Sequence, residues 1–434
     1  MATAVQVEFD FSPSAGDTPG AAARAGTALC LSGGGWRAAL FHLGGLTRLN
    51  EVGILPQVGT ISAVSGGSIL AGFVQGQIAD GWPLPGGSWR RTILEPFCRH
   101  AGRDLRSDAF RARANPFGPK AADVLAGTLD QALGLGGKRL EALPTDVDFV
   151  FGAADIVSGR YWIFSRTRLG YADTGVTVAA TGPSPLISVA PKVAAQGTIA
   201  AAVAASSCFP PVFAPMRFEI RGCEEEGVGL LVDGGLIDNT GVEAVIKRAA
   251  CILVSDGGGK FDAGWRGGGV RSFLRYAQVS DHRGRTLSRR WLTERFARDA
   301  PAGVAWSIRE GEWAGAQVPE TATAVGAIPA YSREVAARIG LIRTDLDSFS
   351  DAEIAILVNH GYLVCSRTLA ASWPAADGSR PVTLPFPALG PEETPDPELL
   401  HALCMSPTRQ LLGRGKRRLP VLDDFVFGRA PDCD

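Results

Sequence analysis

The stretch TALCLSGGGWRAALFHLGGLTRLN, residues 27–50, joins a short apolar strand to a helix through three glycines. Gly33, Gly34 and Gly35 lower the helix propensity where the helix begins, and Arg37 adds a positive charge to a first turn whose dipole disfavours cations. Both choices oppose local stability, so the stretch indicates a functional loop. Backbone N–H groups at such a helix end can bind a phosphate or a transient oxyanion.

The glycine loop lacks the features of a phosphate-binding loop. No lysine follows it at the P-loop spacing, and Ala38 stands where the dinucleotide pattern G-x-G-x-x-G has its last glycine. An oxyanion site is therefore the better interpretation, and it predicts a nucleophile at the end of a neighbouring strand.

A candidate nucleophile lies one strand–helix unit downstream. The sequence VGTISAVSGG, residues 58–67, predicts a strand that enters a tight turn at Ser65 and continues into a helix. In such a nucleophile elbow the serine has a strained backbone, and the residues two before and two after it must be small. Ala63 and Gly67 meet this condition. Two neighbouring serines remain as alternatives: Ser62 and Ser68.

Strands and helices alternate along the chain, which predicts an α/β fold with a mainly parallel sheet. Beyond the first two strand–helix units, two strands are expected around a turn at 157–160, and two apolar strands end in Asp-Gly-Gly at Asp233 and Asp256. Helices are expected at 36–51 and 68–79, before the prolines at 210–211, and from an N-cap at Ser350.

Composition excludes several classes of protein. With 46% hydrophobic and 20% charged residues the chain can build a large core, and its net charge of −1 argues against a nucleic-acid polymer as partner. The eight cysteines contain no C-x-x-C pair, and no metal-ligand cluster is visible. The longest apolar window, 197–215, is interrupted by serines and prolines, and the N-terminus has no secretory signal, so we expect a cytoplasmic protein.

The succession GGGWR, AVSGGS, ASSCFPP and DGG resembles the bacterial branch of the patatin-like phospholipase family from Leu29 to about Asp238. The resemblance implies a three-layer α/β sandwich with a Ser-Asp dyad, acting on lipid acyl esters without a metal or other cofactor. It implies Ser65 as nucleophile and Asp233 as the dyad aspartate. The oxyanion loop would be Gly33, Gly34 and Gly35.

Two residues depart from the family pattern: Ala38 and Ala63 each replace a glycine. Arg37 would orient the loop or contact a lipid phosphate, and the alternative is a solvated residue of the first helical turn. The ASSCFPP segment is either a plain helix end or, by the resemblance, a wall of the acyl pocket.

The general base has alternatives. A Ser-His-Asp triad in the usual chain order would use His282, His360 or His401, but none has a motif around it, and we expect His360 near the surface. Asp256 resembles Asp233 locally. We choose Asp233 because the succession from ASSCFPP to DGG resembles the family only at that position, and because a polar loop, DGGLIDNTG, follows it.

The chain is expected to have three parts: a flexible leader at 1–26, a patatin-like hydrolase domain at 27–370 with a helical cap or insertion around 82–144, and a C-terminal extension at 371–434. Residues 266–298 carry nine arginines against Asp281 and Glu294. This segment is either a solvated helix face or a contact for anionic lipid or an anionic activator, which allows peripheral membrane contact.

The expected function is a serine acyl hydrolase that cleaves esters of phospholipids or other lipids through an acyl-enzyme. Two alternatives remain: a non-lipid serine esterase or peptidase, and a regulated effector or scaffold with a normally silent hydrolase. Head group, chain length and oligomeric state are not determined by the sequence.

Overall fold

The computed structural model describes most of the chain. The described residues are 25–79, 81–105, 107, 121–172, 197–210, 213–220, 227–259, 270–298, 302–309, 313, 328–373, 381–392, 397, 399–400 and 403. The predicted leader and most of the C-terminal extension therefore lie outside them. Residues 106 and 108–120 of the predicted cap region also lie outside them, and so does His401.

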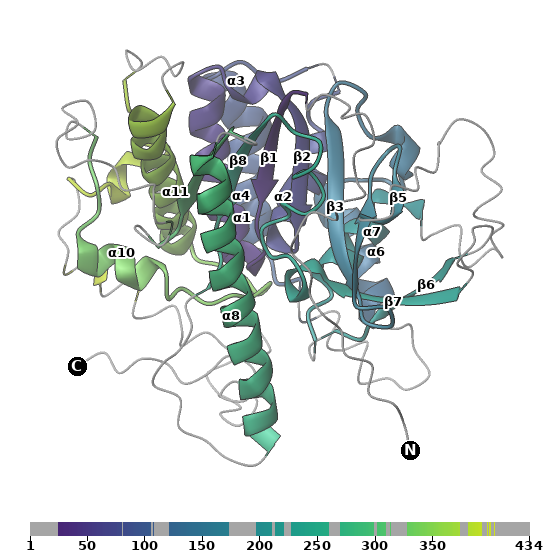
Figure 1. The fold of residues 1–434 in the computed structure, drawn as a ribbon. Coiled ribbons are helices and arrows are strands. Elements are labelled where there is room, and N and C mark those ends of the chain that lie inside the picture. Colours follow the sequence, from purple (N-terminus) through teal and green to yellow (C-terminus); the bar gives the residue numbers. More distant parts are fainter. Residues whose placement is uncertain are drawn as a thin grey trace.

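A single sheet of nine strands forms the centre of the described part (Figure 1). Its strands are β1 (Thr27–Leu31), β2 (Val58–Val64), β3 (Asp148–Asp155), β4 (Arg160–Phe164), β5 (Leu169–Tyr171), β6 (Met216–Ile220), β7 (Gly227–Asp233), β8 (Cys251–Asp256) and β9 (Ala302–Ser307). The order is β5-β4-β3-β2-β1-β8-β9, and β7 pairs with β3 and with β6. The run from β3 through β2, β1 and β8 to β9 is parallel, and the pairs formed by β4, β5, β6 and β7 are antiparallel.

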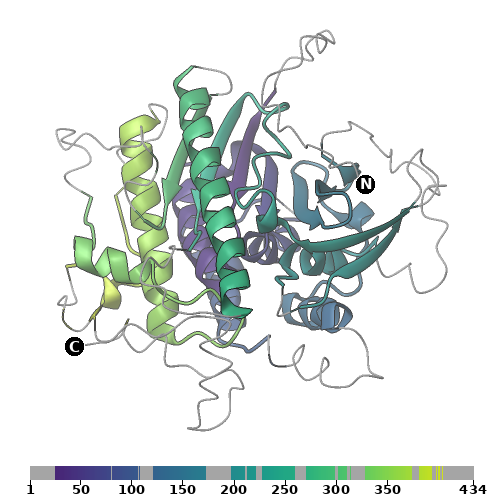
Figure 2. The ribbon, with the colours of Figure 1, turned by 60° about the horizontal axis from the view of Figure 1, so that its bottom comes forward.

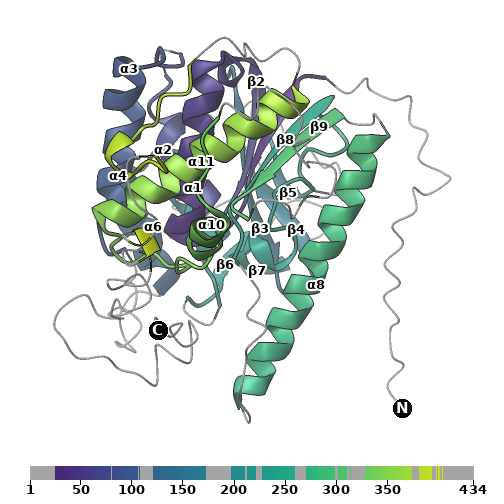
Figure 3. The same ribbon diagram turned by 90° about the vertical axis from the view of Figure 1, so that its left-hand side faces the viewer.

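Helices cover both faces of the sheet. They are α1 (Gly35–Glu51), α2 (Gly66–Gln75), α3 (Gly87–Trp89), α4 (Glu95–Ala101), α6 (Ala121–Leu133), α7 (Ile199–Ser207), α8 (Val270–Ala297), α10 (Arg333–Ile339) and α11 (Asp351–Ser372). Short 3-10 or π turns lie at Leu55–Gln57, Arg90–Leu94, Leu140–Ala142, Gly234–Leu236 and Pro387–Leu389. Figure 3 shows α1, α2 and α11 on one side of the sheet and α8 on the other. This arrangement confirms the predicted α/β fold with a mainly parallel sheet.

Side-chain alternation along the strands produces the layers. In β1, Leu29 and Leu31 belong to the large core under α1 and α11, whereas Ala28 and Cys30 belong to the smaller core on the opposite face. Successive residues of a strand point to opposite faces, so a strand that is apolar throughout is buried between two helical layers.

The strand β3 is bordered by two strands that meet end to end. Its first half pairs with β2 in parallel, as far as Val64 opposite Gly152, and its second half pairs with the antiparallel β7, beginning at Asp233 opposite Ala153. The residue after Val64 and the last residue of β7 are therefore brought to adjacent positions along one strand.

Helix α11 packs along α1 on one face of the sheet (Figure 2). Ser350 caps it in a capping box with Glu353, as the sequence predicted for this N-cap. A Cβ placed on Gly44 would lie 2.0 Å from the Val358 carbonyl oxygen, so only glycine allows the two helices to cross so closely. Among the described helices, α11 is the one that is long and apolar enough to cross a membrane, judged by length and composition alone. However, 89% of its apolar stretch is buried inside the protein. The window at 197–215, expected to be the longest apolar one, instead contains the short helix α7.

Candidate active site

Ser65 occupies a strained turn between β2 and α2. Its φ of 51° and ψ of −118° make it the one non-glycine residue with a positive φ among the described residues. Such a conformation is disfavoured for a residue with a side chain and persists only where surrounding contacts impose it. The geometry is that of the predicted nucleophile elbow, and Ser65 is 9% exposed.

The two neighbouring serines are engaged in structural hydrogen bonds. Ser62 Oγ donates to the Gly241 carbonyl oxygen at 2.6 Å, and Ser68 Oγ is 2.8 Å from Ser206 Oγ. Both side chains are fully buried. The contacts therefore favour Ser65 over Ser62 and Ser68 as the candidate nucleophile.

The end of α7 holds the Ser65 turn and the end of β7 together. Ser206 Oγ accepts the Ser65 N–H at 3.0 Å, and Ser207 Oγ donates to the Ser65 carbonyl oxygen at 3.2 Å. The carbonyl oxygen of the next residue, Cys208, accepts the Asp233 N–H at 3.0 Å. Three consecutive residues of the ASSCFPP segment thus bind the backbones of both candidate catalytic residues, which is more than a plain helix end requires.

Asp233 ends β7 next to the Ser65 turn and is 5% exposed. Its Oδ1 atom accepts the Gly235 N–H at 2.8 Å, which caps the short turn Gly234–Leu236. The hydrogen bonds of the described residues do not include one from Ser65 Oγ to Asp233. The structure therefore brings the two residues together in the fold without joining their side chains directly.

The second aspartate, Asp256, is committed to an ion pair. Its Oδ2 atom accepts from Arg289 Nε at 2.9 Å and lies 2.8 Å from Arg289 Nη2, and its Oδ1 atom accepts the Gly258 N–H. Burial alone would raise the pKa of Asp256, but the charge of Arg289, the Gly258 N–H and Arg285 outweigh it and lower that pKa. Asp256 is therefore an anchor for α8.

The glycine loop is held by hydrogen bonds on either side of its centre. The Gly33 N–H donates to the Asn239 carbonyl oxygen at 3.0 Å, and the Trp36 N–H donates to the Asp345 carbonyl oxygen at 2.9 Å. Gly34 and Gly35 have φ values of 143° and 57°, which L side chains rarely adopt. Within the described part of the chain, their N–H groups make no hydrogen bond.

Arg37 is buried beneath this loop, which contradicts the alternative of a solvated first-turn residue. Its Nη1 atom donates to the Ile342 carbonyl oxygen at 2.8 Å and its Nη2 atom to the Gly257 carbonyl oxygen at 3.3 Å. Burial first, then the charges of Arg309 and Arg285, lower its pKa to about 9, so it stays charged at neutral pH. The contacts match the loop-orienting role, and a phosphate contact stays a prediction.

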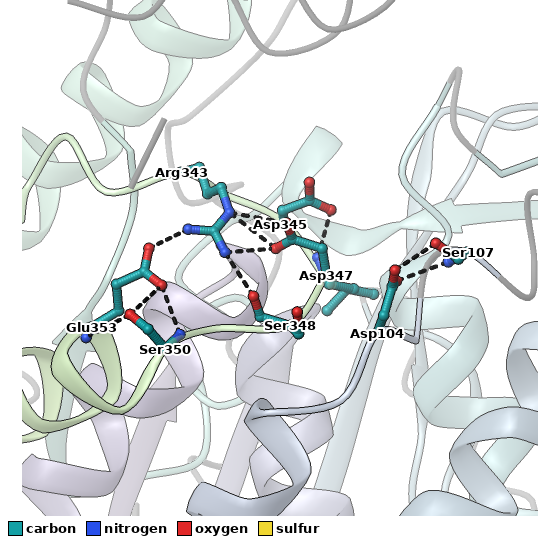
Figure 4. A network of polar contacts seen from close by, with 9 residues as sticks. Asp104, Ser107, Arg343, Asp345, Asp347, Ser348, Ser350 and Glu353 are labelled. Carbon is teal, nitrogen blue, oxygen red and sulfur yellow. Dashed lines mark hydrogen bonds and ion pairs between the residues drawn. The ribbon is translucent and has the colours of Figure 1, made fainter. Parts of the chain in front are cut away.

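A distant segment, residues 342–349, supports the glycine loop from outside. Figure 4 shows how Arg343 holds it: Nε and Nη2 pair with Asp347, Nη1 pairs with Glu353, and Nη2 donates to the Ser348 carbonyl oxygen at 3.0 Å. Burial alone would lower the pKa of Arg343, but the two carboxylates outweigh it and raise that pKa. The network fixes the chain on both sides of Asp345, whose carbonyl oxygen caps the start of α1.

The histidines do not form a triad with Ser65 in the described structure. His360 is 1% exposed, so its expected place near the surface is wrong, and its Nε2 atom bonds the Ile308 carbonyl oxygen at 2.8 Å. His42 is fully buried between Ser255 and Ser32, and burial lowers its pKa to about 4. His282 lies partly exposed on α8. No group of His, Cys, Asp or Glu side chains among the described residues could hold a metal ion.

Asn239 is a site residue that was not predicted from the sequence. A Cβ placed on Gly33 would lie 2.5 Å from Asn239 Oδ1 and 3.1 Å from Ser65 Cβ, and one placed on Gly235 would lie 2.6 Å from the same oxygen and 3.0 Å from Asp233 Oδ1. The Asn239 amide is therefore packed between the glycine loop and the end of β7. Its place in the polar DGGLIDNTG loop was the available signal.

The fold and this site define an α/β protein with a strained serine turn between a strand and a helix. The patatin-like phospholipase family pattern matches residues 29–246, half of the chain, and the protein belongs to that family. Membership implies lipid hydrolase activity in general terms.

Solved structures also match the chain. Human GIVD cytosolic phospholipase A2 matches at 15% identity and a TM-score of 0.36, covering 54% of this chain and 45% of that one. VipD from Legionella pneumophila matches at 13% identity and a TM-score of 0.31, covering 80% of this chain and 67% of that one. This chain thus aligns with less than half of the human phospholipase chain. No curated protein matches it.

Proposed function

We propose that the protein is a serine acyl hydrolase that cleaves lipid esters, phospholipids among them, with Ser65 as nucleophile and Asp233 as general base. The observation that carries this proposal is the end of α7, which binds the Ser65 backbone through Ser206 and Ser207 and the Asp233 backbone through Cys208. Catalysis by two residues requires that their relative position be fixed, and these three hydrogen bonds restrain the Ser65 and Asp233 backbones relative to each other.

In the proposed reaction, Asp233 takes the hydroxyl proton as Ser65 Oγ attacks the ester carbonyl carbon. The π electrons of the carbonyl bond move onto its oxygen, which gives a tetrahedral intermediate. This intermediate then collapses with loss of the alcohol, which receives the proton from Asp233. Water, deprotonated by Asp233, then attacks the acyl-enzyme; the Ser65–acyl bond breaks, the fatty acid leaves, and Asp233 returns the proton to Ser65 Oγ. The Ser65–Asp233 hydrogen bond would form when substrate binds, because such bonds are often long in free enzymes.

The developing oxyanion would be stabilised by Gly34 and Gly35, whose N–H groups have no acceptor among the described residues. Gly33 has its N–H committed to Asn239, so its contribution would be to let the loop approach Ser65. A donor aimed at the transition state contributes about 3–4 kcal/mol in comparable hydrolases.

The function is tested by treating the purified protein with a fluorophosphonate and locating the label by mass spectrometry. In parallel, hydrolysis of phospholipid and of a short-chain ester is measured. Labelling at Ser65 together with release of fatty acid from phospholipid would support the proposal. Labelling with turnover of the short-chain ester alone would indicate a non-lipid esterase, and absence of label at Ser65 would refute the proposal.

Substitution Gly35→Ala is expected to lower kcat by about 10²-fold or more with little change in KM, because the oxyanion forms only in the transition state. The added Cβ would lie 2.6 Å from the Asp345 carbonyl oxygen and force the loop to move. Steady-state kinetics checks this, with the melting temperature measured alongside. Gly53→Ala is the matched control, since Gly53 also has a positive φ but no atom within 4 Å of its Cβ position. A folded Gly35→Ala enzyme with unchanged kcat would contradict the oxyanion assignment.

Substitution Arg343→Lys is expected to lower kcat by roughly 10- to 100-fold through misplacement of the glycine loop, with KM nearly unchanged. Lysine keeps the charge but cannot reach Asp347, Glu353 and the Ser348 carbonyl together. Arg338→Lys on α10 is the control, because it makes the same change outside the network. Equal kinetics for the two variants would show that the network does not position the loop.

A further inference from the structure

Helix α8 projects beyond the edge of the sheet that carries the candidate site. Arg289 pairs with Asp256, the last residue of β8, and β8 ends level with β1, whose last residue lies opposite Ser255. The chain after α8 enters β9, which is parallel to β8, so α8 runs antiparallel to both strands. Residues 270–288 precede Arg289 in the helix, lie toward that edge and span about 28 Å of helix. Figures 1 and 3 show this half of α8 standing clear of the other helices and strands.

One face of α8 packs against the protein. Arg289 pairs with Asp256, Leu292 is 1% exposed and belongs to the smaller core, and the partly buried Phe296 packs against that core. These three residues follow the i, i+3, i+7 spacing of one helical face. The opposite face is therefore directed away from the sheet.

The outward face combines apolar and basic side chains. Val279, Leu287 and Trp291 are 46%, 47% and 39% exposed, and the Arg295 guanidinium lies 5.2 Å from the centre of the Trp291 ring. Arg283, Arg290 and Arg298 are also exposed, and Glu294 is the one exposed carboxylate among the side chains of α8 that the structure describes. Basic residues beside exposed Leu and Trp are the composition of helices that bind the headgroup region of membranes.

We infer that this face of α8, defined by Val279, Arg283, Leu287, Arg290, Trp291 and Arg298, docks the protein onto an anionic lipid surface. The arginines complement lipid phosphates, and Leu287 and Trp291 enter the interface, which a polyanion in water would not require. Because α8 projects from the edge that carries Ser65, docking through α8 holds that edge of the sheet beside the lipid surface. The inference rests on the proposed function for its purpose, but the binding itself can be measured without any hydrolysis.

The test is sedimentation of the Ser65→Ala protein with vesicles of phosphatidylcholine alone and of phosphatidylcholine mixed with phosphatidylglycerol. We expect binding to the mixed vesicles that weakens as salt rises from about 0.05 to 0.5 M. Arg283→Gln with Arg290→Gln should weaken that binding about 10- to 30-fold. Leu287→Ala with Trp291→Ala should weaken it at least tenfold, at roughly 0.8 kcal/mol per CH₂ removed from the interface.

Matched controls come from the far side of the molecule, near α3 and α4 (Figure 3). Arg91→Gln with Arg99→Gln removes two exposed arginines there, and Leu84→Ala removes a leucine that is 76% exposed. Both controls should bind like the parent protein. Equal losses in the controls, equal binding to both vesicle types, or heparin binding that replaces vesicle binding would each overturn the inference. Failure of Ser65 to react with a fluorophosphonate would count against the proposed function alone.

Discussion

Substitution Ser65→Ala is expected to lower kcat by about 10⁴-fold or more, because removal of a nucleophile leaves only binding and oxyanion stabilisation. Alanine is small enough for the elbow, and it relieves little of the positive-φ strain, so the fold should remain. Hydrolysis of phospholipid, with circular dichroism for the fold, measures the effect.

Ser68→Ala is the control for this substitution. It removes a buried hydroxyl three residues away that bonds Ser206, so it should reduce stability by about 1 kcal/mol and leave most of the activity. If Ser65→Ala retained more than a small part of the activity, or if Ser68→Ala abolished it, the nucleophile would be misassigned.

Substitution Asp233→Asn is expected to lower kcat by about 10²- to 10⁴-fold, since an amide cannot accept the Ser65 proton. It should also slow the reaction of Ser65 with a fluorophosphonate. The amide oxygen can still accept the Gly235 N–H, so the capping turn Gly234–Leu236 should persist. The labelling rate therefore reports the loss of the base apart from any change in substrate binding.

Asp256→Asn is the informative comparison because both aspartates end a strand at Asp-Gly-Gly. It leaves Arg289 without its carboxylate, and removing one partner of a buried pair costs about 3–5 kcal/mol. We therefore expect a clear fall in melting temperature with much of the activity retained at low temperature. If Asp256→Asn abolished turnover in folded protein while Asp233→Asn did not, the two roles would be reversed.

The sequence predicted those features whose causes are local. Three glycines before a helix and a small-residue turn at Ser65 are needed for backbone conformations that are strained for other residues, so their pattern is visible in a short stretch. The apolar strand that ends at Asp233 is equally local. Family resemblance then related these pieces and led to the three-layer fold, which the helices on both faces of the sheet confirm.

Contacts between distant parts of the chain were not predictable in this way. Nothing around Arg343 or Asp345 indicates that residue 345 caps a helix that begins at residue 35. Asp256 resembled Asp233 until its pairing with Arg289 was known, and His360 was expected near the surface because its helix, α11, was not known to be buried. Such contacts depend on which elements pack together in the fold, and a local sequence pattern does not indicate which distant elements will pack together.

The family pattern ends at residue 246, but the sheet does not. A fragment that ended there would contain Ser65, Asp233 and the glycine loop, yet it would lack β8, which pairs with every residue of β1. The hydrogen-bonding edge of β1 and its apolar faces would then be exposed to other molecules, which promotes aggregation. It would also lack the carbonyl groups of Gly257, Ile342 and Asp345 that hold Arg37 and Trp36. The smallest unit suited to recombinant expression must therefore reach through α11, well past the last recognisable motif.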